Sequence, residues 1–110
     1  MPTVGRGAGG GPVLLELPAS GCTLLVPELP AGRDWSQSER DRWEELWESP
    51  QATVWDDSVR GTVAMLIVYE TALLGGVASA WQALEMRHAS EGLGLTPRGM
   101  AALGWKIVDR

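Results

Sequence analysis

The sequence is poor in the side chains that carry out most enzymatic chemistry. It contains one cysteine, Cys22, and one histidine, His88. A lone cysteine excludes an intrachain disulfide, and a zinc site would need ligands that the chain does not supply. A nucleophilic pair of Cys22 and His88 would require the extended segment around Cys22 to fold back, which no pattern indicates. We therefore expect no enzymatic activity, no metal site and no cofactor.

Membrane-spanning and secretory segments are missing as well. No segment has the length of a membrane span, and the first residues lack the basic and apolar regions of a signal peptide. The glycine-rich stretch 5–11 is not followed by the Gly-Lys-Ser/Thr of a phosphate-binding loop. Together with the lone cysteine, these absences predict a protein of the reducing cytoplasm that has no membrane partner.

Positive charge is scarce and unevenly placed. The 110 residues hold 9 Lys and Arg against 14 Asp and Glu, a formal charge of -5. Residues 34–57 carry eight acids and two bases, whereas residues 58–110 carry five bases and four acids. Any surface that binds anions should therefore use the second half of the chain. The acidic stretch is either a solvated surface or a docking patch for a basic partner.

A long apolar segment dominates the middle of the chain. Residues 63–69 form an unbroken apolar run that is nearly free of charge. The apolar pattern extends over about 17 residues, which is too long for a typical strand. After the break at Gly75 and Gly76, apolar residues recur at helical spacing at Val77, Ala80, Trp81 and Leu84. We predict an all-α fold built on a central antiparallel helical hairpin.

The first helix of this hairpin is apolar on every side, which a lone surface helix cannot sustain in water. A chain of this length also buries only part of its unfolded surface. We therefore predict that the excess apolar surface is buried by self-association. The expected interface residues are Val63, Leu66, Ile67 and Leu73.

Helix boundaries are marked by capping residues. Ser36 and Glu39 have the spacing of a capping box, which predicts a helix from there to about residue 48. Ser49–Pro50 ends that helix and starts a short turn. Asp57 or Ser58 should then cap the long apolar helix.

The two ends of the chain differ in character. Residues 1–12 hold five Gly and two Pro, which predicts a flexible tail. Residues 13–30 contain two short apolar runs that could pair weakly, and we expect extended chain that orders only against a partner. Residues 31–110 are predicted to form a helical oligomerisation domain, closed by a short helix after Thr96–Pro97.

Three local patterns resemble one family. They are Leu-Pro-Ala-Gly-Arg-Asp-Trp-Ser (29–36) followed by Trp43, Trp47 and Ser-Pro-Gln-Ala (49–52); Leu-Gly-Leu-Thr-Pro-Arg (93–98); and Leu-Gly-Trp-Lys-Ile (103–107). In this order, they resemble small terminase subunits of tailed phages of actinobacteria. The resemblance covers roughly residues 29–108. Gly99 and Gly104 depart from it, since relatives more often have a polar residue and an arginine there.

The resemblance implies a non-enzymatic part of a genome-packaging motor that works in the host-cell cytoplasm. Such subunits form homo-oligomeric rings, recognise viral double-stranded DNA and deliver it to the large terminase subunit, which carries the ATPase and nuclease. The implied DNA-binding residues are Arg60, Arg87, Arg98 and Lys106. Residues 105–110 or the N-terminus would contact the large subunit. The alternative is a helical interaction module without a DNA role, such as a phage connector or adaptor component, which the overall acidity favours.

Overall fold

The structure is a computed structural model that describes residues 12–109. The described chain is mostly helical and includes one small sheet. Its α-helices and strands are β1 (Leu15–Pro18), α1 (Gln37–Trp47), α2 (Arg60–Leu74), α3 (Ala80–Gly92), α4 (Pro97–Leu103) and β2 (Trp105–Val108). Two short 3-10 helices, η1 (Pro50–Thr53) and η2 (Asp57–Val59), connect α1 to α2.

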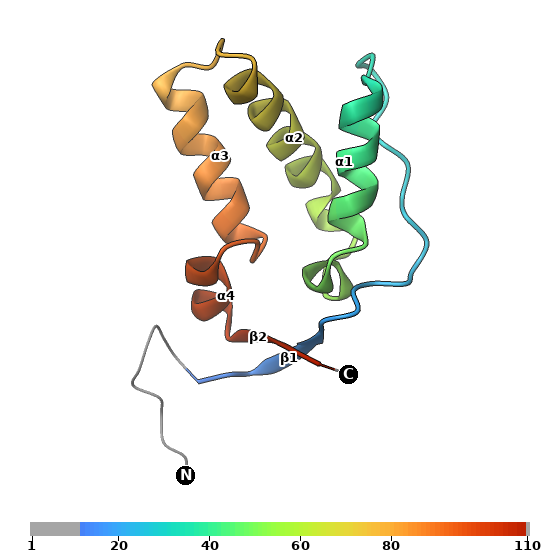
Figure 1. Ribbon diagram of the computed structural model, residues 1–110, viewed down its shortest axis with the longest axis vertical. Coiled ribbons are helices and arrows are strands. Elements are labelled where there is room, and N and C mark those ends of the chain that lie inside the picture. Colours follow the sequence, from blue (N-terminus) through green and yellow to red (C-terminus); the bar gives the residue numbers. More distant parts are fainter. Residues whose placement is uncertain (1–11, 110) are drawn as a thin grey trace.

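Helix α2 lies between α1 and α3 and packs against both (Figure 1). Four of its apolar residues, Val63, Ala64, Leu66 and Ile67, are therefore covered by the same chain. Val63 and Leu66 are 0% exposed and Ile67 is 1% exposed. This burial corrects the assignment of these three residues to a subunit interface. The helix does need partners, as predicted from its composition, but α1 and α3 supply them.

Four of the six tryptophans pack into the core near α1 and η1. Trp35, Trp43, Trp47 and Trp55 are all buried. The ring centroids of Trp43 and Trp47 are 5.6 Å apart, and those of Trp47 and Trp55 are 5.2 Å apart in an edge-on arrangement. Aromatic side chains supply large apolar areas, so this cluster gives a small domain much of its core.

Local capping signals position the helices largely as predicted. The Ser36–Glu39 capping box starts α1, and Ser49 caps η1 with Pro50 in its first turn. The start of α2 differs from the prediction. Asp56 caps η2 by accepting from the Ser58 amide, and α2 follows without a side-chain cap of its own. The chain thus enters its longest helix through a 3-10 turn.

The C-terminal helices also begin at capping residues. Ser79 and Gln82 form a capping box at the start of α3, which the apolar spacing had placed a few residues earlier. Thr96 caps α4, as predicted. Gly94, in the turn between α3 and α4, has φ +75°, and a Cβ there would lie 2.2 Å from the Trp105 ring. Only glycine fits both the backbone conformation and the close approach of the indole.

Strands β1 and β2 form a two-stranded parallel sheet, which the all-α prediction lacks. The register runs from Leu15 opposite Trp105 to Pro18 opposite Val108. Leu17 in β1 is 1% exposed. Strands of four residues carry no local signal for a partner far away in sequence, so the pattern did not predict this pairing.

The segment before α1 is extended, as expected, but it is ordered without a partner molecule. Trp43 and Trp35 donate their indole N–H groups to the carbonyls of Pro27 and Pro30, at 2.6 and 2.9 Å. Cys22 is buried against the core. The segment therefore orders against its own chain. Of the predicted flexible tail, residues 1–11 lie outside the described residues.

Candidate functional site

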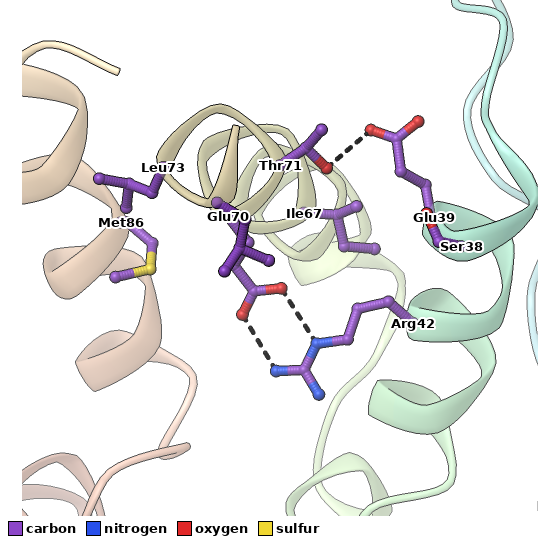
Figure 2. A pocket seen from close by; sticks show the side chains of 9 residues that line it. Ser38, Glu39, Arg42, Ile67, Glu70, Thr71, Leu73 and Met86 are labelled. Carbon is purple, nitrogen blue, oxygen red and sulfur yellow. Dashed lines mark hydrogen bonds and ion pairs between the residues drawn. The ribbon is translucent and has the colours of Figure 1, made fainter. Parts of the chain in front are cut away.

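A mostly apolar groove lies over α2, between α1 and α3 (Figure 2). It has a volume of about 450 Å³. Its apolar lining comes from α2 and α3, namely Ile67, Leu73, Leu74 and Met86. The polar lining comes mainly from α1. A concave apolar site with a few polar groups is the usual form of a ligand or partner site.

One ion pair crosses the groove. Nε and Nη2 of Arg42 each donate to one carboxylate oxygen of Glu70, both at 3.0 Å (Figure 2). Nη1 of Arg42 also contacts Glu45. The Glu70 carboxylate raises the pKa of the Arg42 guanidinium. This two-point contact fixes α1 against α2, and it uses both carboxylate oxygens of Glu70.

Glu39 is the second charged group of the groove, and it is almost completely buried. It accepts from the Ser36 amide at 2.9 Å, from Nη2 of Arg33 at 2.8 Å and from the Thr71 hydroxyl at 3.0 Å. Burial alone would raise the pKa of Glu39, but the Ser36, Arg33 and Thr71 hydrogen bonds and the Arg33 charge lower it to about 2. Glu39 is therefore ionised at neutral pH and saturated with donors.

The charged groups of the groove are paired within the chain. A carboxyl with a pKa near 2 neither holds nor takes up a proton at neutral pH. Among residues 12–109, no three His, Cys, Asp or Glu side chains gather in a way that could hold a metal ion. Cys22 is buried in the core and His88 is exposed on α3, beside Glu85 at 3.9 Å. The groove is thus an apolar hollow whose Arg42, Glu39 and Glu70 charges are matched within the chain.

The residues predicted to bind DNA fall into two groups. Arg87, Arg98 and Lys106 lie exposed on α3, α4 and β2, and none of the three has an ion pair within the described chain. Helix α4 packs against both α3 and β2, so these elements form one continuous part of the fold. Arg60 is different, because it begins α2 and its Nε donates to the Glu28 carbonyl at 2.8 Å.

The sequence pattern named Trp81 and Leu84 as positions of the second hairpin helix, but it did not predict that they are exposed. Leu73, the fourth predicted interface residue, lines the groove. Trp81 is 62% exposed and Leu84 is 43% exposed. The Trp81 ring packs edge-on against Tyr69, with centroids 6.4 Å apart. The excess of apolar positions around the hairpin was visible in the pattern, but their orientation depends on where α1 packs.

Comparison with protein-family models, with curated proteins and with solved structures finds no match for this chain. None of the helices in residues 12–109 combines the length and apolar character needed to cross a membrane.

Proposed function

We propose that this chain is the small terminase subunit of a tailed phage, which binds viral double-stranded DNA and passes it to the large terminase subunit. The motifs at residues 29–52 and 93–107 motivate the proposal. The observation that carries it furthest is the set of unpaired, exposed bases Arg87, Arg98 and Lys106 on packed neighbouring elements.

The charge distribution supports this choice of surface. Residues 80–108, which contain α3, α4 and β2, carry three bases and two acids. Residues 37–59, which contain α1, η1 and η2, carry seven acids and two bases. Helices α1 and α3 lie on opposite sides of α2 (Figure 1). DNA phosphates are thus attracted to the α3 side and repelled from the α1 side.

A chain with few bases needs many copies to hold DNA. A closed ring multiplies the phosphate contacts of each protomer, so a net-acidic subunit can still bind in a salt-dependent way. With Val63, Leu66 and Ile67 buried in the core, the contact between copies is assigned to the exposed Trp81 and Leu84 on the antiparallel α2–α3 hairpin. Exposed apolar patches of this kind usually mark interfaces.

The decisive experiment is a titration of labelled duplex DNA by fluorescence anisotropy between about 50 and 300 mM salt, because protein–phosphate contacts weaken as the salt concentration rises over this range. We expect salt-dependent binding that the double change Arg87→Glu and Arg98→Glu abolishes. Arg40 on α1 is also exposed and has no ion pair among the described residues, so Arg40→Glu is the matched charge control. Binding that survives the double change, or that Arg40→Glu weakens equally, contradicts the proposed surface.

Light scattering tests the assembly and separates the proposal from its alternative. We expect a single large species, which Trp81→Glu dissociates without loss of helical circular dichroism. A clean monomer or dimer that binds no DNA at low salt would instead support the interaction module without a DNA role. The net charge of -5 is the observation that favours this second candidate.

A further inference from the structure

A second, smaller pocket lies apart from the groove, where the extended segment 22–27 crosses η1 and the turn into η2. Its volume is about 170 Å³. The extended segment contributes Cys22, Leu24 and Leu25, and the helical side contributes Trp47, Trp55 and Asp57. We call these six residues and the space between them the tryptophan pocket.

The outer wall of the tryptophan pocket is held in place at both ends. The Cys22 amide donates to the Glu48 carbonyl at 3.0 Å, and the Pro27 carbonyl accepts from the Trp43 indole at 2.6 Å. Between these anchors, Leu24 is 68% exposed and Leu25 is 96% exposed. An anchored segment that presents two adjacent leucines to water offers a preformed apolar contact surface.

Hydrogen bonding at this pocket is incomplete, in contrast to the groove. Nε1 of Trp47 is the one buried side-chain polar atom of residues 12–109 without a hydrogen-bond partner. The Asp57 carboxylate has neither a hydrogen bond nor an ion pair in the described chain. Buried polar groups are normally satisfied, and this donor belongs to a ring that lines the pocket.

The charge around the pocket indicates which kind of partner binds there. Glu48, Asp56 and Asp57 are exposed, and residues 37–59 hold seven acids and two bases. Such a surface repels nucleic acid and attracts cations. An arginine or lysine suits the site doubly, because its aliphatic stem packs on apolar and aromatic walls while its charged head reaches a carboxylate.

We propose that the tryptophan pocket docks a basic, apolar segment of a partner protein. An arginine or lysine of that segment enters beside Trp55 and pairs with Asp57, and a neighbouring apolar side chain packs on Leu24 and Leu25. This site uses the acidic side of the fold and stands whether or not the α3 side binds DNA.

The test is a selection of random 12-residue displayed peptides on the intact chain, followed by anisotropy titration of the selected peptides. We expect the selected peptides to combine Arg or Lys with apolar neighbours. We expect Asp57→Lys and Leu25→Ser each to weaken their binding by at least about 5-fold, the size of a lost charge pair or apolar contact.

Two controls match these variants in chemistry and exposure. Leu74 is 90% exposed but lines the groove, so Leu74→Ser should leave peptide affinity within about 2-fold. Asp34 lies before α1 and outside the tryptophan pocket, so Asp34→Lys makes the same charge change elsewhere. Leu24→Ser replaces Leu25→Ser if circular dichroism shows that the latter is not folded.

Three results would overturn the proposal. They are a selection that enriches no peptide, a selection that enriches acidic or uncharged peptides, and binding that the control variants weaken as much as Asp57→Lys and Leu25→Ser do.

Discussion

Trp55 donates its indole N–H to the backbone carbonyl of Leu93 at 3.1 Å, and both residues are buried. A residue of the connection between α1 and α2 thereby holds the carbonyl of Leu93, the C-cap residue of α3. The contact spans 38 positions of the sequence, so it ties together parts of the fold that local capping cannot reach.

Trp55→Phe should therefore lower the free energy of unfolding by about 1–3 kcal/mol, because it leaves the buried Leu93 carbonyl without a donor. Urea denaturation followed by circular dichroism measures the change. Trp47→Phe is the matched control, since Trp47 is also buried but its indole has no acceptor. An equal loss in the two variants would show that packing alone, and not the hydrogen bond, accounts for the effect of Trp55.

The buried carboxyl of Glu39 predicts an acid-dependent stability. Its pKa falls from an ordinary 4.5 to about 2 in the folded chain. Above about pH 4.5 the stabilisation is fully present, and it is lost as the pH falls toward 2, because the unfolded chain binds the proton first. We expect a loss of about 3 kcal/mol over this range, measured by urea unfolding at several pH values.

Glu39→Gln should flatten that part of the pH profile and lower the stability at neutral pH. Glu44 lies exposed on the same helix, so Glu44→Gln should keep the profile of the parent chain. A Glu39→Gln profile that runs parallel to the parent's would mean that other carboxyls are responsible.

A change at Leu66 distinguishes a position in the core of the protomer from one at a subunit interface. It is 0% exposed, so Leu66→Ala should leave a cavity and cost about 3–5 kcal/mol. Its neighbour Met65 is 45% exposed, and Met65→Ala should cost less than about 1 kcal/mol. Chemical denaturation of both variants makes the comparison. If Leu66→Ala lowers the stability only slightly but changes the molar mass of the assembly, Leu66 belongs to a subunit interface after all.

Gly99 lets α4 approach the end of α3. A Cβ at this position would lie 2.3 Å from the Glu91 carbonyl oxygen, so Gly99→Ala must push the two helices apart. We expect it to lower the free energy of unfolding by roughly 1–3 kcal/mol. Gly61 is also helical but has nothing within 4 Å of its Cβ position, so Gly61→Ala should stabilise by about 0.5–1 kcal/mol. Opposite signs for the two changes in thermal unfolding would bear this out, and equal effects would contradict it.

The sequence predicted those parts of the fold that short-range chemistry decides. The capping box at Ser36, the turn at Ser49 and the start of α4 at Thr96 were all confirmed. Each depends on a side chain and a backbone amide only three residues apart, so the pattern contains the whole interaction.

The parts that could not be predicted depend on contacts between distant residues. The Arg42–Glu70 pair and the parallel pairing of β1 with β2 join positions whose local patterns carry no sign of each other. The same limit explains the assignment of Leu66 to a subunit interface. An apolar helix shows that it must be covered, but not whether the cover comes from its own chain or from a second copy.

The pairing of β1 with β2 has a consequence for the order of synthesis. Leu17 is among the most completely buried side chains, yet its strand partner, Ile107, is translated after all of the helices. On a ribosome, β1 must remain unpaired while α1, α2 and α3 assemble. Distant pairings of this kind form late, because the loop between them has to close first. The apolar strand β1 is thus the segment most in need of protection from aggregation in a nascent chain.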